Sequence, residues 1–424
     1  MLEISPRKRL SGEITVPGDK SVSHRAVLFG SIADGVTKIS NFLNGQDCVS
    51  TISCFKSMGI DIKTDGYEVF VSGRGMRGLK APDTVLYTGN SGTTTRLLTG
   101  LLAAQSFDSV IDGDDSIRTR PMDRVIKPLS MMGADIIPSD GGRCPLRIKG
   151  KKLNGIEYTL PVPSAQVKSA VILAGLYADG ETVIIENIKS RNHTELMLGM
   201  FGSDCGMSDG IIRVRHTDKL NAAEIDIPGD ISSAAFFMVA GLLSENSEII
   251  LRNVGINPTR SGIITVLRNM GGDIMIENIR GDFEPSADII VRSSDLSGTE
   301  ISGDIIPSLI DEIPAIAAAA AFATGKTVIS GASELKHKET DRIKSIVSEL
   351  KKANVDIFET ADGFIINGGN PVRASEFDSF GDHRIAMAMS VLALNARGTS
   401  VIKNHEACGV SYPGFYEDLF SLTR

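Results

Sequence analysis

The chain has 424 residues, of which 42% are hydrophobic and 23% are charged, and its net charge is −8. A chain of this length exceeds one ordinary hydrophobic core, so two globular domains are expected. The net negative charge argues against a protein that binds nucleic acid. The longest apolar run, residues 313–323, is shorter than the ~20 residues that span a bilayer and contains Pro314.

The first residues, MLEISPRKRLSGEITV, lack the apolar stretch of a signal peptide, and this favours a cytoplasmic protein. The five cysteines form no CxxC pair, and the six histidines show no HExxH-like spacing. We therefore expect reduced thiols, no disulfide framework and no metal site.

Six segments of the chain share one pattern, in which a turn is followed by a polar capping residue and a small-residue apolar run. In chain order the segments are 17–35, 88–104, 162–180, 228–244, 310–325 and 380–398. Their expected capping residues are Lys20, Asn90, Ser164, Asp230, Asp311 and Asp382. The period of roughly seventy residues is longer than the ~20–50 residues of common solenoid repeats, so each repeat must be a small assembly of its own. Apolar runs without a wide polar face predict buried helices.

After each apolar run, the repeat continues with a β-rich run and a second helix, and most repeats close with two short strands. The second helices are expected to begin near residues 47, 121–123, 193–195, 259–261, 340–341 and 411–413. The pattern predicts an α/β fold of six βαβαββ repeats, three in each domain, with three buried central helices per domain.

The repeat starts in the first half carry cations and hydroxyls, in GDKSVSHRA, GNSGTTTR, IRTRPMDR, VPSAQVKSA and KSRNHTE. Because free N–H groups at helix starts attract anions, this pattern favours a site for a multiply charged small molecule. Taken alone, GDKSVSHRA is equally well explained as an ordinary capped helix with exposed charges, and for GNSGTTTR alone a turn with a capped helix is favoured.

The second half contributes ELKHKETDRI, FGDHRIAM and the pair Asp311–Glu312 before an alanine-rich helix. Spacing predicts that Lys338 and Arg342 share one helix face, with Glu339 beside them as a possible proton carrier. The alternative is a surface charge ladder. Asp311 is interpreted either as a helix cap or as a general base among cationic motifs.

Together these motifs resemble the 5-enolpyruvylshikimate-3-phosphate synthase family, in the bacterial group that carries SAQVKSA, over residues 7–420. The resemblance implies a two-domain inside-out α/β barrel, the enolpyruvyl transferase fold. One domain is expected to comprise residues 1–15 and 226–424 and the other residues 16–225, with the active site in the cleft between them.

The resemblance also implies transfer of the enolpyruvyl group of phosphoenolpyruvate to the 5-hydroxyl of shikimate 3-phosphate, with release of phosphate. The reaction is an addition followed by an elimination through a tetrahedral intermediate, on the pathway to chorismate and the aromatic amino acids. No metal or organic cofactor is implied. The expected protein is a cytoplasmic monomer that binds its two small-molecule substrates, no nucleic acid and no membrane. Glyphosate, which mimics phosphoenolpyruvate, is the family's inhibitor.

Residue by residue, the resemblance implies three groups of site residues. The residues implied in catalysis are Asp311, Glu339 and Lys20. The residues implied in binding shikimate 3-phosphate are Lys20, Ser21, Arg25, Ser164, Ala165, Gln166, Arg191, Asp311 and Lys338. The residues implied in binding phosphoenolpyruvate are Lys20, Gly92, Arg120, Gln166, Arg342 and Arg384.

One position departs from the family pattern, because Val410 stands where many members have a lysine before Thr-Phe-Pro. Two rival functions stay open. One is the sister transferase that acts on UDP-N-acetylglucosamine, whose first motif usually reads Lys-Asn and whose arginine loop often holds a reactive cysteine; here the motif is KSVSHR and IRTRPMDR has no cysteine. The other is a non-catalytic anion-binding protein, which would be expected to lack Asp311 or Glu339.

Overall fold

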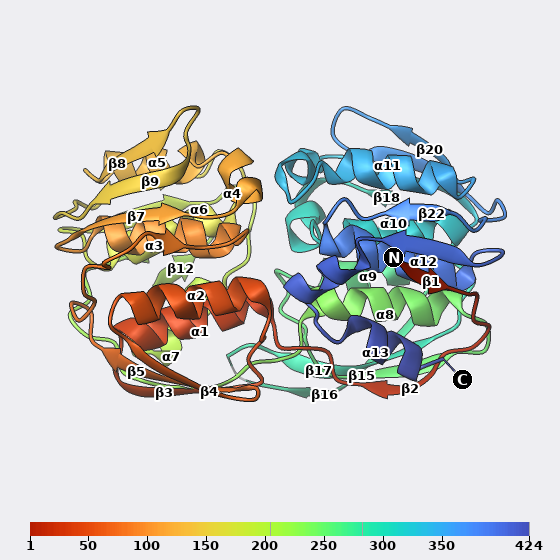
Figure 1. Cartoon of the computed structure of the whole chain (residues 1–424), viewed down its shortest axis with the longest axis horizontal. Coiled ribbons are helices and arrows are strands. Elements are labelled where there is room, and N and C mark those ends of the chain that lie inside the picture. Colours follow the sequence, from red (N-terminus) through yellow and green to blue (C-terminus); the bar gives the residue numbers. More distant parts are fainter. Residues whose placement is uncertain (204, 282, 424) are drawn as a thin grey trace. The chain divides into compact units, whose positions relative to one another are not determined.

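The computed structural model describes residues 1–203, 205–281 and 283–423. The chain divides into two compact units. The continuous unit is Gly18–Ile227, and the discontinuous unit combines Met1–Pro17 with Pro228–Arg424. These boundaries lie two residues from those expected from the sequence. Figure 1 labels the helices and strands of both units.

The continuous unit holds three repeats. Its elements in chain order are α1 (Lys20–Ile32), β3 (Asp34–Ser40), α2 (Gln46–Ser57), β4 (Asp61–Asp65), β5 (Glu68–Arg74), β6 (Leu86–Tyr87), α3 (Gly92–Ala103), β7 (Asp108–Asp112), α4 (Asp115–Thr119), α5 (Asp123–Met131), β8 (Asp135–Ser139), β9 (Arg143–Lys149), β10 (Glu157–Thr159), α6 (Ala165–Gly175), β11 (Thr182–Ile185), α7 (His193–Met200), β12 (Gly206–Ser208), β13 (Ile211–Val214) and β14 (Glu224–Asp226).

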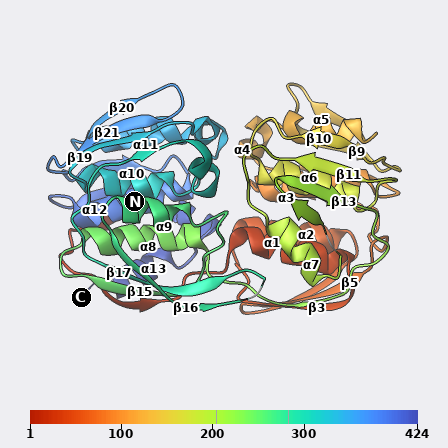
Figure 2. The same cartoon turned by 180° about the vertical axis from the view of Figure 1, so that it is seen from behind.

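The discontinuous unit holds the other three repeats, and Figure 2 shows the same elements from behind. Its elements in chain order are β1 (Leu2–Ile4), β2 (Ser11–Ile14), α8 (Ile231–Leu243), β15 (Glu248–Gly255), α9 (Gly262–Asn269), β16 (Asp273–Arg280), β17 (Ser286–Arg292), β18 (Glu300–Ile301), η1 (Gly303–Ser308), α10 (Ile313–Phe322), β19 (Gly325–Ile329), η2 (Ser333–His337), α11 (Arg342–Lys352), β20 (Asp356–Glu359), β21 (Phe364–Gly368), β22 (Glu376–Asp378), α12 (His383–Asn395), β23 (Ser400–Lys403), η3 (His405–Val410) and α13 (Phe415–Ser421).

Within the described residues, each repeat builds on one sheet, and the sheets of the first five repeats share one strand order. In β6-β7-β9-β8, the first two strands run parallel and the last two form an antiparallel hairpin. The same order recurs in β10-β11-β13-β12 and β18-β19-β21-β20. With their two helices, these repeats have the expected βαβαββ composition. The sixth repeat differs, because its three-stranded sheet is completed by the antiparallel strand β1 in place of a hairpin.

The first and the fourth repeats exchange their leading strands. Strand β14 immediately precedes α8 in the chain, but it pairs in parallel with β3 in the sheet of the first repeat. Strand β2 precedes α1, yet it pairs in parallel with β15 in the sheet of the fourth repeat. Each exchanged strand thus completes the four-stranded sheet of the other repeat.

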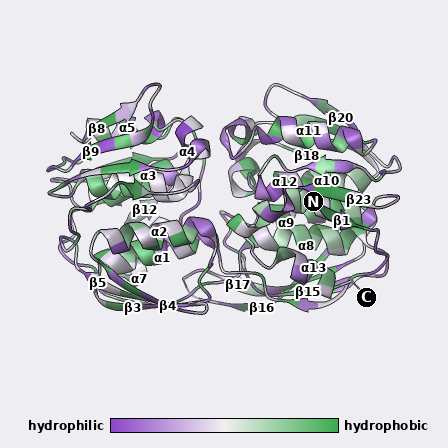
Figure 3. Cartoon of the chain, viewed as in Figure 1, coloured by the Kyte–Doolittle hydropathy of each residue, from purple (hydrophilic) through white to green (hydrophobic). Residues whose placement is uncertain are grey.

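The first helix of each repeat is central and buried, as its apolar sequence predicts. In α8, residues Ile231 to Leu242 are all buried, and α10 is buried from Ile313 to Ala321. Helices α8, α10 and α12 pack against one another, while α3 packs against α6 in the continuous unit. Figure 3 shows the predominantly apolar colouring of α8. Helix α10 tolerates Pro314 because this residue lies in the first turn, where its missing N–H has no intrahelical partner to lose.

Three of the six expected capping residues differ by one position. The carboxylate of Asp19, not Lys20, accepts the N–H of Val22 and caps α1. Ser91, not Asn90, caps α3. Helix α10 follows Glu312, which makes no side-chain cap, so Asp311 lies one residue before the cap position. The caps at Ser164, Asp230 and Asp382 are as expected.

Within the described ranges, none of the helices is both long enough and apolar enough to cross a membrane.

Candidate functional site

The N-terminal ends of the central helices carry most of the predicted site residues. In the continuous unit, Lys20 is the first residue of α1, and its Nζ lies 3.0 Å from the Oδ2 of Asp47 in the first turn of α2. Ser21 follows Lys20 in the first turn of the same helix. The Lys20 ammonium is therefore held at a helix start, where an anion is favoured.

Arg25 is buried one turn further along α1 and is fixed at each of its nitrogens. Its Nε donates to Thr194 Oγ1 at 2.7 Å, its Nη2 to Ser169 Oγ at 2.7 Å and its Nη1 to the Ser21 carbonyl at 3.0 Å. A guanidinium held this way presents a fixed positive charge with little entropy left to lose.

The glycine loop at the start of α3 brings in a cation that sequence reasoning did not assign. Arg96 Nη1 donates to Gln166 Oε1 at 2.8 Å, and Gln166 Nε2 donates to Thr93 Oγ1 at 3.0 Å. A Cβ at Gly92 would lie 2.7 Å from Arg96 Nη1 and 3.3 Å from Arg120 Nη1. The available signal was the spacing of Gly92 and Arg96, four residues apart on one helix face.

The remaining predicted residues of this unit lie on α4, at the start of α6 and just before α7. Arg120 is buried at the C-terminal end of α4, and its Nη2 donates to Ser116 Oγ at 3.0 Å. Ser164 caps α6, which begins at Ala165. Arg191 lies in the segment between β11 and α7 and is partly exposed.

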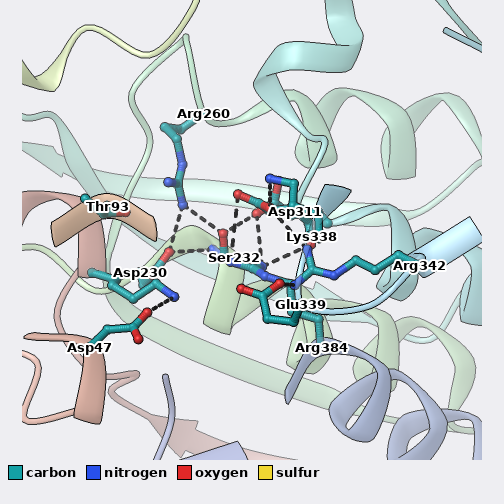
Figure 4. Close-up of polar contacts among 12 residues, drawn as sticks. Asp47, Thr93, Asp230, Ser232, Arg260, Asp311, Lys338, Glu339, Arg342 and Arg384 are labelled. Carbon is teal, nitrogen blue, oxygen red and sulfur yellow. Dashed lines mark hydrogen bonds and ion pairs between the residues drawn. The ribbon is translucent and has the colours of Figure 1, made fainter. Parts of the chain in front are cut away.

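In the discontinuous unit, five predicted residues form one network around Asp311 (Figure 4). The Oδ1 of Asp311 accepts from Lys338 Nζ at 2.9 Å and from Arg342 Nη1 at 3.2 Å. The Arg384 Nη1 donates to the backbone carbonyl of Asp311 at 3.0 Å. Glu339 Oε2 lies 2.6 Å from Arg342 Nη2. Two cations thus share one oxygen of the Asp311 carboxylate.

Arg342 is the centre of this network and is almost wholly buried, with 1% of its side chain exposed. Its Nε donates to Asp382 Oδ2 at 2.8 Å. Burial acts to lower the pKa of Arg342, but the charges of Asp382, Glu339 and Asp311 outweigh it and raise that pKa above its ordinary value. Arg342 is thus permanently charged.

One detail of the expected arrangement is wrong, because Lys338 and Arg342 do not share a helix face. Lys338 is the C-terminal cap of the short helix η2, and α11 begins only at Arg342. The two cations meet because both point to Asp311.

A second group of contacts joins the starts of α8, α10 and α12. Arg384 Nη1 lies 3.8 Å from Oε1 of the fully buried Glu312, and the same oxygen accepts the hydroxyl of Ser232. Arg260 Nη2 donates to Ser232 Oγ at 2.8 Å and to Asp230 Oδ1 at 2.9 Å. Sequence reasoning assigned no role to Glu312 or Arg260.

Each unit therefore presents cations at the starts of buried helices, and one of them adds a carboxylate held between cations. This arrangement can bind phosphate and carboxylate groups and can exchange a proton with a bound hydroxyl. Across the ranges that the structure describes, no group of three or more His, Cys, Asp or Glu side chains has the arrangement of a metal site. Val410 is the last residue of η3.

Fold and site together define a six-repeat α/β protein that is built to bind small polyanions. The sequence matches the family described as EPSP synthase (3-phosphoshikimate 1-carboxyvinyltransferase) over residues 4–419, and the chain belongs to this family. The family and the fold expected from the sequence are thereby confirmed.

Similar proteins cover nearly the whole chain. The 3-phosphoshikimate 1-carboxyvinyltransferase of Thermoanaerobacter sp. (strain X514) is 52% identical over 417 residues, which is 98% of each chain. That of Geobacillus kaustophilus (strain HTA426) is 54% identical over 417 residues, covering 97% of this chain and 98% of the relative. The solved EPSP synthase of Acinetobacter baumannii is 45% identical, with a TM-score of 0.89, and the match covers 99% of this chain and 98% of that one.

Proposed function

We propose that this chain transfers the enolpyruvyl group of phosphoenolpyruvate to the 5-hydroxyl of shikimate 3-phosphate, which yields 5-enolpyruvylshikimate 3-phosphate and phosphate. The observation that carries the proposal is the Asp311 carboxylate, which Lys338 and Arg342 hold next to Glu339, in a chain of the EPSP synthase family.

The two substrates are assigned to different sets of side chains. Shikimate 3-phosphate is assigned to Lys20, Ser21, Arg25, Ser164, Ala165, Gln166, Arg191, Asp311 and Lys338. Phosphoenolpyruvate is assigned to Lys20, Gly92, Arg120, Gln166, Arg342 and Arg384. Fixed guanidinium groups such as Arg25 and Arg342 suit these anions because they lose little freedom when the substrate binds.

Asp311 and Glu339 carry the proton transfers in this proposal. Asp311 accepts the proton of the 5-hydroxyl, and Glu339 delivers a proton to the methylene carbon of phosphoenolpyruvate. The hydroxyl oxygen then adds to C2 to give a tetrahedral adduct whose C3 is a methyl group. The ionised Glu339 takes a proton back from this methyl group as the C2–O bond to phosphate breaks, and this elimination regenerates the enol ether. The departing phosphate takes up the proton held by Asp311. Arg342 and Arg384, which both contact Asp311, stabilise the charge that moves onto the departing phosphate. Lys20 assists from the start of α1.

The assignments draw on both units, so we place the reaction in a cleft between the continuous and the discontinuous unit. We further propose a cytoplasmic monomer that needs no cofactor and no nucleic-acid partner. Size-exclusion chromatography with light scattering tests the monomer, for which the mass expected is 45.2 kDa.

An assay of phosphate release with two acceptors tests the function. Purified protein with phosphoenolpyruvate should release phosphate in the presence of shikimate 3-phosphate and not in the presence of UDP-N-acetylglucosamine. Release with the nucleotide sugar would favour the sister transferase, and release with neither would favour a binding protein.

A further inference from the structure

We propose that Glu186, together with Lys168 and Glu195, is a positioning residue for the shikimate 3-phosphate side of the site, and that it acts by fixing the 186–195 segment that carries Arg191. This inference rests on the proposed function. None of these three residues is among the site residues assigned above, and all three lie within the continuous unit.

The three side chains form a buried charged cluster between α6 and the segment that follows β11. Lys168 Nζ lies 2.8 Å from Glu186 Oε2 and 2.7 Å from Glu195 Oε1. The exposed side-chain fractions are 1% for Lys168, 5% for Glu186 and 1% for Glu195. Buried charges at this depth are costly unless they are paired, so their presence calls for a function beyond packing.

Glu186 directs its second oxygen to the backbone of the segment. Glu186 Oε1 accepts from the Ser190 N–H at 3.3 Å and also from the Ser190 hydroxyl. The Lys168 ammonium additionally donates to the Ser190 carbonyl at 3.5 Å. Ser190 is therefore held through its N–H, its side chain and its carbonyl, one residue before Arg191.

The other end of the segment is tied to the same stretch of α6. Ser169, the neighbour of Lys168, is hydrogen-bonded to Thr194 at 2.6 Å, and Thr194 is the neighbour of Glu195. Arg25 donates to both hydroxyls, Ser169 Oγ and Thr194 Oγ1, at 2.7 Å. Two consecutive residues of α6 thus hold two consecutive residues of α7, and Arg25 shares that contact.

The segment between Ser190 and Thr194 is consequently fixed at both ends relative to α1 and α6. Helix α1 carries Arg25, and α6 carries Gln166 and is capped by Ser164. All three are among the groups assigned to shikimate 3-phosphate. A side chain on a loop can bind an anion tightly only if the loop is held before the anion arrives. The cluster supplies that support for Arg191 and none for the residues assigned to phosphoenolpyruvate in the other unit.

The decisive variant is Glu186→Ala, because it separates positioning from charge balance. Wild type buries one ammonium with two carboxylates, so removal of Glu186 leaves the Lys168–Glu195 pair and no unpaired buried charge. We expect the KM for shikimate 3-phosphate to rise about 10-fold, which corresponds to the loss of one to two hydrogen bonds. The KM for phosphoenolpyruvate should change less than about 2-fold. Glu186→Gln keeps an acceptor for Ser190 and should recover most of the loss.

A matched control is Asp288→Ala in the discontinuous unit. Asp288 is also a buried carboxylate. Its Oδ1 accepts a hydrogen bond from the backbone N–H of Asn253 at 2.9 Å, and its Oδ2 accepts one from Arg252 Nη1 at 3.0 Å. The Asp288→Ala substitution should lower the melting temperature without raising the KM for shikimate 3-phosphate relative to that for phosphoenolpyruvate.

Calorimetric titration of each protein with shikimate 3-phosphate alone separates this inference from the proposed function. If wild type shows no turnover, the proposed function fails, while the binding constants still judge the role of Glu186. Weaker binding in Glu186→Ala than in Glu186→Gln and Asp288→Ala supports it. Equal binding in all four proteins, or a parallel rise of both KM values, overturns it. If Glu186→Ala does not fold, Ser190→Ala removes the hydroxyl contact to Glu186, and binding by Ser190→Ala equal to that of wild type overturns the inference.

Discussion

At the scale of single residues, Asp311 offers the sharpest test of the proposed chemistry. Its carboxylate is held by Lys338 and Arg342 through Oδ1, which an asparagine oxygen could also provide. Asp311→Asn should therefore keep the network but lose the base, and kcat should fall by about 10²–10⁴-fold, as general-base loss typically does. Steady-state phosphate release measures kcat, and calorimetry should still detect shikimate 3-phosphate binding. Turnover near that of wild type would remove Asp311 from the role of base.

A second residue-scale prediction concerns Gly92. An added methyl group would lie 2.7 Å from Arg96 Nη1 and 3.3 Å from Arg120 Nη1, so at least one guanidinium must move. We expect Gly92→Ala to raise the KM for phosphoenolpyruvate and to weaken inhibition by glyphosate, since both anions are assigned to this loop. Inhibition series at fixed shikimate 3-phosphate compare the two proteins. Equal inhibition constants would show that the loop does not shape the pocket.

At the scale of elements, the sequence predicted the repeat well because apolar runs and β-branched runs alternate with a long, regular period. All six central helices lie where these runs occur. The capping residues were predicted less accurately, because adjacent polar residues such as Asp19 and Lys20 compete for one capping position. Residues 1–15 were expected in the domain of the second half, but the pairing of β2 with β15 and of β14 with β3 could not be predicted, because strand pairing across roughly two hundred residues leaves no local signal.

The candidate site was predictable where a motif coincided with a helix start and less so elsewhere. Arg342 and Arg384 stand out as charges beside buried helices. Lys338 was placed on the wrong element, because the break at residues 338–341 between η2 and α11 leaves no signal in a run of charged residues. Glu186 escaped notice because its partners Lys168 and Ser190 come from separate elements.

Helices α1, α2 and α3 meet at a buried histidine, which makes their packing sensitive to pH. His24 Nδ1 is hydrogen-bonded to Thr51 at 2.7 Å, and Thr51 to Thr94 at 2.7 Å. Burial first, and then the charges of Lys20 and Arg25, hold the pKa of His24 well below its ordinary value. Its Nε2 has no hydrogen-bond partner within residues 1–203, 205–281 and 283–423. The folded protein therefore keeps this ring neutral.

The consequence is a loss of stability in acid. Below pH ~6.5 the unfolded chain binds a proton at His24 and the folded chain does not, so the free energy of unfolding falls by up to about 1.4 kcal/mol per pH unit from this group. Denaturant unfolding of wild type and His24→Asn between pH 7 and pH 5 measures the effect. The variant should show the shallower decline, and His216→Asn at the surface should match wild type. Identical slopes for wild type and His24→Asn would contradict the expectation.

At the scale of the whole molecule, the chain passes between its two units twice, at Pro17/Gly18 and at Ile227/Pro228. The exchanged strands adjoin these crossings, since β2 ends at Ile14 and β14 at Asp226. Each crossing therefore follows a strand that is paired in parallel and leads into a central helix, α1 or α8. Two short, anchored crossings suit units that move as bodies about their connections while each keeps its sheets intact.

The charges make such a motion dependent on substrate. Lys20 and Arg25 belong to the continuous unit, whereas Lys338 and Arg342 belong to the discontinuous unit, and the proposed function requires shikimate 3-phosphate to contact both sets. Cationic faces repel until an anion bridges them. We therefore expect small-angle scattering to give a smaller radius of gyration with saturating shikimate 3-phosphate than without it. Arg25→Ala, which weakens the anion's hold on one unit, should need more substrate for the same change. A radius that stays constant in wild type while calorimetry shows full binding would refute closure.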